Sequence, residues 1–356
     1  MRYSNYKATD ATTNSSLILT AISQPNYSYL IDGAVQYALE NLLDKEPKEQ
    51  AEVAMDYLLV QVGIEILSMI PGRVSISIDP RLAYDYTGII QKARNLITLF
   101  EQHNISRNRI LIKIPATYAG IRAAQTLETP PSNVDEQPET QQEPIHTNLT
   151  LVFDIVQATA CAQAKASVIS PFVGRVQSKD RSSFSSTEQL LFEHQGLRLI
   201  RDISARYDAC GYETQIMAAG FRRPEEVLEV AKHKNRAPHF VTLPPKILHG
   251  LRSMRNVGSL TQRKPPPQED GEGSTERTYL SQPGRKLDVE AEKRFMDDLV
   301  KERIALDKVP EALEKFAEDA GILEEKLKVQ LMLAKAGSSS PTMPGGWNIK
   351  YAEVKL

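Results

Sequence analysis

Strand-like and helix-like hydrophobic patterns alternate along most of this chain. Residues 73–79 alternate polar and apolar with a period of two, whereas 110–115 is an almost unbroken aliphatic run, typical of a strand covered on both faces. Residues 27–43 and 49–69 carry apolar side chains at helical spacing. Further strands are expected at 148–150, 167–170, 214–218 and 239–243. Further helices are expected at 87–103, 117–127, 187–207, 224–232, 287–306 and 309–334, with one more between residue 150 and residue 166.

This alternation predicts parallel strands joined by helical crossovers, as in a (β/α)₈ barrel or a doubly wound sheet. No Gly-x-Gly-x-x-Gly motif follows a strand, so a dinucleotide site has no support. The barrel is favoured because its carboxyl strand ends converge on one mouth. Polar residues occur at the ends of several predicted strands: Asn14, Ser77, Lys113, Asn148, Ser170 and Arg222.

We expect one barrel domain over residues 1–335. Two stretches rich in proline and polar residues, 128–147 and 263–284, are expected to be flexible surface loops. The Ser/Pro/Gly-rich segment 336–356 is expected to be a disordered tail.

Composition narrows the functional classes only slightly. The formal net charge is −2, which gives no reason to expect a nucleic-acid or membrane-surface partner. Cys161 and Cys210 are the only cysteines, and two thiols without a secretory signal indicate a reducing compartment rather than a disulfide framework. A soluble cytoplasmic protein is therefore the expectation.

Lys113 interrupts the aliphatic run at 110–115. Burial would disfavour its charged form, lower its pKa toward neutrality and make the amine nucleophilic, as Schiff-base chemistry on a carbonyl requires. The alternative is a surface lysine on an edge strand or at a strand end.

Five ordered blocks resemble the transaldolase family, a family of class I Schiff-base enzymes. The resemblance extends from residue 10 to about residue 334. The blocks are Asp-Ala-Thr-Thr-Asn at 10–14, Ile-Leu-Ile-Lys-Ile-Pro at 110–115 with Gly-Ile-Arg-Ala-Ala at 120–124, Asn-Leu-Thr-Leu at 148–151, Ile-Ser-Pro-Phe-Val-Gly-Arg at 169–175, and Gly-Tyr-Glu-Thr at 211–214 leading to Phe-Arg at 221–222.

The resemblance implies a (β/α)₈ barrel with extra C-terminal helices. It also implies transfer of a dihydroxyacetone unit between sugar phosphates in the pentose phosphate pathway, without metal or cofactor. Its implied partners are sugar phosphates, with no nucleic acid or membrane; a homodimer is left open. The implied roles are Lys113 as the Schiff-base residue, Thr150 positioning a catalytic water, Asn14 and Asn148 holding donor hydroxyls, Arg175 and Arg222 clamping phosphate, and Ser170 and Phe172 lining the site.

Two departures from the family concern acid–base groups. The chain starts after the family's first strand, which ends in an acid/base aspartate, so we expect a barrel incomplete at its N-terminus. In the family's third strand, which corresponds to residues 75–79 here, Ser77 stands where the family has a glutamate that activates water. General acid–base groups contribute about 10²–10⁴-fold, so reduced activity is expected. The alternatives are a non-catalytic sugar-phosphate-binding homologue and a class I aldolase with a changed substrate.

Three smaller departures lie close to these motifs. Ser15 replaces a proline and Gly220 replaces a phosphate-contacting serine, whereas Asp154 is an unexpected carboxylate one turn after Thr150. One hypothesis is that Asp154 faces the barrel mouth and partly replaces the lost acid/base group. The simpler interpretation, an exposed helix aspartate, is favoured about three to one.

Overall fold

Seven parallel strands in chain order form the central sheet of the computed structural model, which describes residues 7–129, 143–174, 194–232, 237–254, 277–281 and 288–337. The strands are β1 Ala11–Thr12, β2 Val74–Ser77, β3 Ile110–Pro115, β4 Thr147–Val152, β5 Val168–Pro171, β6 Gln215–Ala218 and β7 Phe240–Val241. The helices are α1 Ser15–Ile22, α2 Ser28–Asn41, α3 Pro47–Leu67, α4 Tyr86–Gln102, α5 Tyr118–Glu128, α6 Ile155–Gln163, α8 Gln195–Cys210, α9 Pro224–Lys232, α10 Pro245–Ser253, α11 Val289–Glu302 and α12 Ile304–Gly337. Short 3₁₀ turns include η3 Pro80–Leu82.

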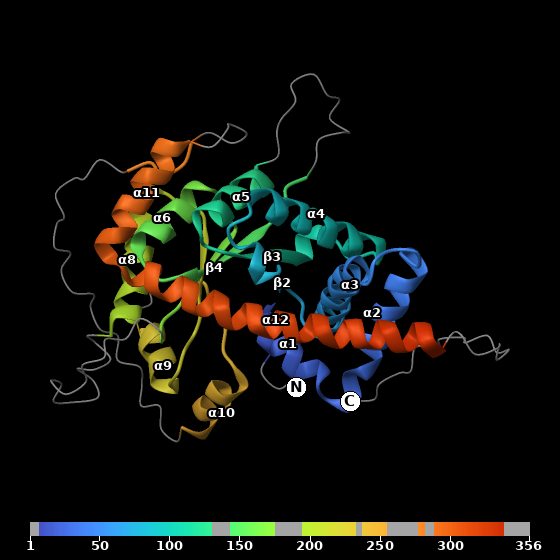
Figure 1. Cartoon of the computed structure of the whole chain (residues 1–356). Coiled ribbons are helices and arrows are strands. Elements are labelled where there is room, and N and C mark those ends of the chain that lie inside the picture. The colour runs from blue at the N-terminus through green and yellow to red at the C-terminus, as the bar shows by residue number, and fades with distance from the viewer. Residues whose placement is uncertain are drawn as a thin grey trace.

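The sheet curls so that its two edges approach each other. The hydroxyl oxygens of Thr12, in β1, and Thr242, just after β7, are 2.9 Å apart. Arg73 Nη2 donates to Gln215 Oε1 at 2.9 Å, which joins the starts of β2 and β6. The predicted parallel α/β barrel with extra C-terminal helices is therefore confirmed, with seven strands among the described residues (Figure 1).

Two apolar clusters lie on opposite faces of the curled sheet. Inside the barrel, Leu111, Val168 and Met217 pack together with Phe240. A much larger cluster joins the outer faces of the strands to the surrounding helices. Every residue of β3 and of β4 is buried, as expected for parallel strands covered on both faces. Lys113 thus lies in a central strand, and the edge-strand alternative is wrong.

The two C-terminal helices differ from the sequence prediction in where they divide. The patterns placed the break near residues 307–308, whereas α11 ends at Glu302 and α12 begins at Ile304. Arg303 between them adopts a left-handed backbone with φ of 57°. Pro310 lies in the second turn of α12 rather than at its first position.

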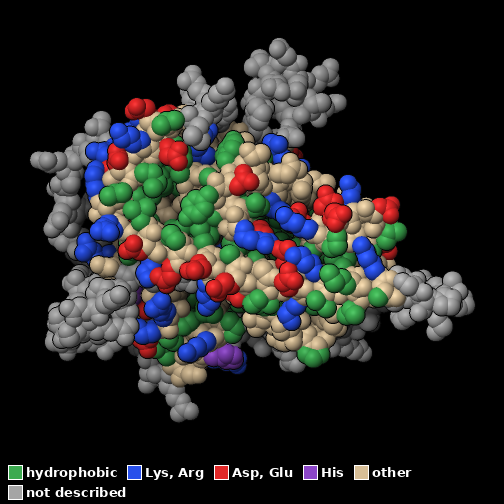
Figure 2. Space-filling view, viewed as in Figure 1, with side chains coloured by type: hydrophobic (Ala, Val, Ile, Leu, Met, Phe, Trp, Pro, Cys, Tyr) green, Lys and Arg blue, Asp and Glu red, His purple; other side chains and the backbone are tan. Residues whose placement is uncertain are grey.

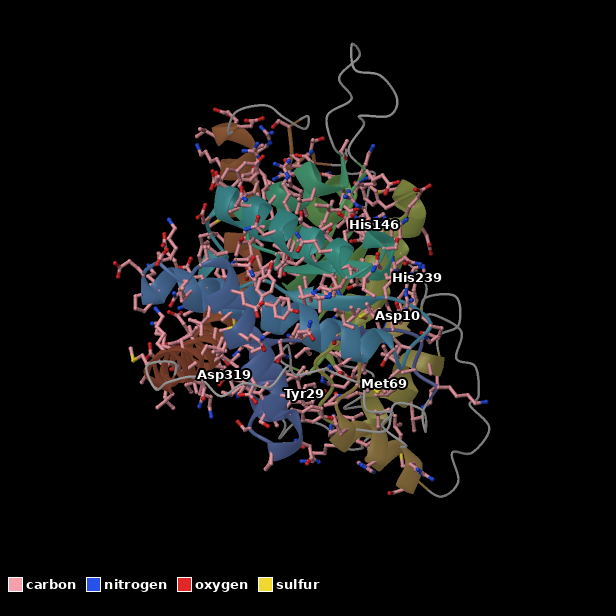
Figure 3. The ribbon with its side chains drawn as sticks, turned by 90° about the vertical axis from the view of Figure 1, so that its right-hand side faces the viewer. Asp10, Tyr29, Met69, His146, His239 and Asp319 are labelled. Carbon is pink, nitrogen blue, oxygen red and sulfur yellow. The ribbon has the colours of Figure 1, made fainter. Side chains whose placement is uncertain are left out.

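Helix α12 crosses the carboxyl side of the barrel and packs on α1, α2, α3, η3 and β4 (Figure 1). Asp10, His146 and His239 each precede a strand and lie along one side of the molecule, whereas Asp319 of α12 lies on the other (Figure 3). Ser16 of α1 donates a hydrogen bond to Asp319. The long helix therefore covers part of the end where the strands finish.

The amino end of the barrel is fastened by one buried carboxylate, Glu128, at the end of α5. Its Oε1 accepts hydrogen bonds from Thr147 N (2.6 Å), Thr147 Oγ1 (2.7 Å) and Ser167 N (2.8 Å). Its Oε2 accepts from Ser167 Oγ at 3.0 Å and lies 3.3 Å from His146 Nδ1. One side chain thus ties the starts of β4 and β5 to a helix.

Parts of five predicted segments lie outside the described residues: 130–142, 263–276 with 282–284 and 338–356 of the predicted loops and tail, and 187–193 and 287 of two predicted helices. Within the expected loop 263–284, residues 277–281 are described. Tyr279 and Leu280 in this stretch are buried. In the described part of the chain, no helix is both long enough and apolar enough to cross a membrane.

We expect Glu128→Ala to lower the free energy of unfolding by about 3 kcal/mol or more, because several buried donors lose their acceptor together. Urea denaturation at neutral pH measures the change. Glu128→Gln, which keeps one acceptor oxygen, should lose less. Glu101→Gln is the matched control, since Glu101 is exposed and pairs with Arg107 at the surface; its effect should stay within about 0.5 kcal/mol. Equal effects of Glu128→Ala and Glu101→Gln would contradict the role of Glu128.

Candidate active site

Lys113 occupies the middle of the barrel mouth on β3. Its side chain is almost fully buried, and Nζ donates a hydrogen bond to the carbonyl oxygen of Thr13 at 3.2 Å. Desolvation lowers the pKa of Lys113 to about 8, because burial penalises the ammonium more than the amine. About a tenth of Lys113 is therefore uncharged at pH 7, far more than for a lysine with an ordinary pKa.

Ser77 on β2 is the neighbour of Lys113 in the strand register. Its Oγ donates to the carbonyl oxygen of Thr13 at 3.1 Å, the same oxygen that accepts from Lys113. Ser77 also lines a small cavity of about 40 Å³ together with Ser15. Two of the positions at which the sequence predicts a departure from the family, 15 and 77, thus border one space.

Asn148 on β4 links strands across the barrel interior. Its Oδ1 accepts from Ser170 Oγ at 2.7 Å, and its Nδ2 donates to Ser75 Oγ at 3.0 Å. Asn148 is also the register neighbour of Lys113. The structure therefore brings Lys113, Asn148 and Ser170 together on three consecutive strands, with their polar groups inside the barrel.

Thr150 lies one step further along β4, beside an irregularity that the sequence did not reveal. The register shifts between Thr150 and Val152, and Leu151 is forced into a left-handed backbone with φ of 61°. Such strain in a non-glycine residue costs energy and is concentrated at functional sites. Thr150 Oγ1 is buried and has no hydrogen-bond partner among the described residues, so its hydroxyl is available to a bound molecule.

Asn14 stands at the start of α1, directly after β1. Its Oδ1 accepts from Leu17 N at 2.9 Å and caps the helix, a common role for asparagine. The cap uses the amide oxygen and leaves the NH₂ group as the donor that could meet a substrate hydroxyl. The helix-cap role and the predicted substrate role are thus compatible in one side chain.

Phe172 and Gly220 fit against each other above the end of β5. The Phe172 ring lies 5.5 Å from that of Phe153 in a tilted arrangement. Gly220 has φ of 71°, and a Cβ there would come within 2.6 Å of the Phe172 ring. The serine expected from the family would be strained and would clash at this position. The change at 220 is therefore linked to the placement of Phe172.

Arg222 follows Gly220 and is exposed. Its backbone N–H donates to Glu226 Oε2 at 2.9 Å, and Glu226 itself is fully buried. Glu226 Oε1 lies 3.4 Å from Arg223 Nε and 3.7 Å from His194 Nε2. Sequence reasoning missed Glu226, which resembles the ordinary acidic residues of a helix first turn. The other predicted phosphate residue, Arg175, lies outside the described residues.

Asp154 is buried, so the interpretation of an exposed helix aspartate is wrong. Its Oδ1 accepts from Gln157 N at 2.8 Å and caps α6, whereas Oδ2 has no hydrogen-bond partner in the described part of the structure. Desolvation raises the pKa of Asp154 to about 7, and the charge of Glu302 adds to the shift. The contacts described for Asp154 are on α6 rather than with Lys113.

The described residues contain no group of three or more His, Cys, Asp or Glu side chains arranged to hold a metal ion. The chemistry that the described site offers rests on an amine, amides, hydroxyls and a guanidinium. These groups suit a carbonyl compound that carries hydroxyls and an anionic end.

Comparisons with known proteins identify the family of the chain. Residues 2–327 match the family model described as transaldolase/fructose-6-phosphate aldolase. A transaldolase of Saccharomyces cerevisiae is 37% identical over 314 residues, covering 88% of this chain and 84% of that protein. A transaldolase of Schizosaccharomyces pombe is 37% identical (92% and 91% covered). One of Actinobacillus succinogenes is 36% identical (92% of each). The chain belongs to the transaldolase/fructose-6-phosphate aldolase family.

Proposed function

We propose that this chain transfers a dihydroxyacetone unit from a ketose phosphate to an aldose phosphate through a Schiff base on Lys113, in the pentose phosphate pathway. The observation that carries the proposal is the buried Lys113 amine with its pKa near 8. Family membership supports a transferase, and the groups around Lys113 support a polyhydroxylated carbonyl substrate.

In this mechanism the neutral amine of Lys113 attacks the ketose C2 carbonyl, and loss of water gives an iminium. The iminium accepts the electron pair of the C3–C4 bond as that bond breaks and the C4 hydroxyl gives up its proton to water, so the donor's aldose phosphate leaves and a three-carbon enamine stays on Lys113. The enamine carbon then attacks the acceptor aldehyde. Hydrolysis of the new iminium releases the product ketose and regenerates the amine.

The surrounding residues have separate roles in this proposal. The amide NH₂ groups of Asn14 and Asn148 hold donor hydroxyls, and Thr150 Oγ1 holds the water used in hydrolysis. Phe172 and Ser170 line the mouth. Arg222, with Arg175, binds the phosphate through charge-assisted hydrogen bonds. Glu226 holds the backbone at Arg222 and acts as a positioning residue.

We further propose that turnover is below that of a complete family member, because Ser77 carries no carboxylate to move a proton. The second candidate, a barrel that binds sugar phosphate without turning it over, is favoured by the same residue. Lys113 distinguishes the two candidates, since a binding protein has no need of a reactive amine. A class I aldolase with a changed substrate would keep the Lys113 chemistry and differ in the acceptor.

Borohydride reduction in the presence of fructose 6-phosphate should leave a covalent adduct on Lys113, identified by peptide mass spectrometry. The initial trapping rate should rise with pH and level off above about pH 8, because the amine must lose its proton first. Lys113→Met should give no adduct, and Lys246→Met, at an exposed lysine of α10, should trap normally. Folded protein without an adduct at any pH would leave the binding protein as the better candidate.

Ser77→Glu should raise turnover by about 10²–10⁴-fold by returning a proton-transfer group to the Lys113 neighbourhood. The small cavity beside Ser77 and Ser15 gives the longer side chain some room. Ser77→Gln is the matched control, with the same size and no carboxylate. Steady-state kinetics with a ketose and an aldose phosphate measure the effect. An equal gain in both variants would show that packing, rather than acid–base chemistry, limits the enzyme.

Arg222→Ala should raise KM for fructose 6-phosphate by about 10–100-fold with little change in kcat, since a charge-assisted hydrogen bond contributes about 1.5–3 kcal/mol. KM for unphosphorylated fructose should not change. Arg222→Lys keeps the charge without the planar fork and should fall between. A similar loss with both sugars would mean that Arg222 supports the fold of the loop rather than the phosphate.

A further inference from the structure

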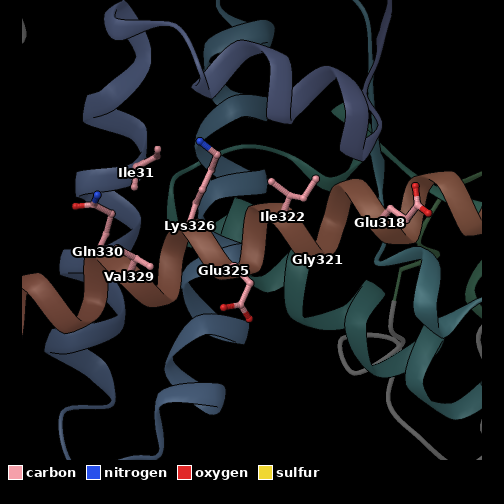
Figure 4. Close-up of a pocket in the computed structure, with 8 residues that line it drawn as sticks. All are labelled: Ile31, Glu318, Gly321, Ile322, Glu325, Lys326, Val329 and Gln330. Atoms are coloured by element: carbon pink, nitrogen blue, oxygen red, sulfur yellow. The ribbon is translucent and has the colours of Figure 1, made fainter.

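A groove of about 800 Å³ lies between α2 and the solvent face of α12, away from the barrel mouth (Figure 4). Its apolar lining consists of Ile31 from α2 with Gly321, Ile322 and Val329 from α12. Ile322 and Val329 are 48% and 51% exposed, although both are large aliphatic residues. Figure 2 shows further hydrophobic side chains, interspersed with charged ones, along the course of α12.

Gly321 leaves the groove side of α12 without a side chain at this position. Glycine is a poor helix former, and a Cβ at this position would meet nothing within 4 Å. Packing within the described fold therefore does not require glycine here. The missing side chain leaves open space next to Ile322, of the kind that a flat aromatic ring fills.

We propose that this groove binds residues 347–351 from the C-terminal segment of this same chain. Helix α12 ends at Gly337, and Gly321 lies sixteen residues back along the helix, about 24 Å at 1.5 Å per residue. The ten residues from Gly337 to Trp347 span up to about 33 Å. Glycine, serine and proline in this connection favour a reversal of direction. The segment is therefore long enough to return to the groove.

The segment also has the chemistry of the groove. Trp347, Ile349 and Tyr351 alternate with Asn348 and Lys350, so in an extended chain the three apolar side chains share one face. That face matches the apolar lining, with the Trp347 ring over Gly321.

Charge at the groove edge favours the same occupant. Glu318 and Glu325 flank the groove with a single cation, Lys326, and Glu325 also pairs with Lys328 at 2.8 Å. Within residues 347–351 the one charged side chain is that of Lys350. Opposite charges at the rim would fix the direction in which the segment lies.

Trp347 is the only tryptophan in the chain, so its fluorescence reports on this segment alone. In the native full-length protein, we expect emission shifted to the blue of the same protein in guanidinium, with low quenching by iodide. Gly321→Leu fills the hollow without weakening the helix, and Val329→Glu places a charge on the lining. Both variants should lose the blue shift and become readily quenched.

Met332→Glu is the matched control, because Met332 is exposed on the same helix and does not line the groove. It should leave the emission unchanged. Native emission equal to that in guanidinium, or emission that the groove variants leave unchanged, would overturn the proposal. A second copy of the chain is the competing occupant. Light scattering would then show a dimer that Val329→Glu dissociates while Trp347 emission stays unshifted, which also overturns the proposal.

Discussion

The desolvation of one amine is the constraint on which the rest of this site depends. Lys113 can lose its charge near neutral pH only if water and acidic side chains are kept from it. The curled sheet meets this condition by placing the lysine in a central strand with both faces covered. The described hydrogen-bond partner of the amine is the carbonyl oxygen of Thr13, which accepts a hydrogen bond without carrying a full charge.

Glu128 at the amino end of the barrel and Thr150 at the carboxyl end differ in whether their polar atoms have hydrogen-bond partners. At the amino end, Glu128 meets several donors at once and leaves them satisfied. At the carboxyl end, Thr150 Oγ1 lacks a partner in the described structure and Leu151 keeps a strained backbone. Satisfied groups stabilise the fold, whereas unsatisfied and strained ones cost stability. Thr150 and Leu151 place part of this cost where a substrate would bind.

Most of the fold could be predicted from the sequence because its signals are local. Aliphatic runs, helical spacing and polar residues at strand ends lie within short windows, and they placed Lys113, Asn148 and Ser170 correctly on their strands. Features that depend on three-dimensional packing could not be predicted in this way. The break at Arg303, the left-handed Leu151 and the buried Glu226 have ordinary local sequences. Asp154 was misjudged because a helix-capping aspartate has the same pattern whether it is exposed or buried.

Ser77 and Lys113 show two requirements that conflict at one position. A carboxylate beside the lysine would move protons during turnover, but it would also favour the ammonium and raise the lysine pKa. Serine at 77 removes the proton carrier and with it the charge that would hold Lys113 protonated. Asp154 Oδ1 caps α6, and none of the hydrogen bonds described for this carboxylate is with Lys113. In the proposed mechanism, serine at 77 therefore favours formation of the Schiff base over the proton transfers that follow.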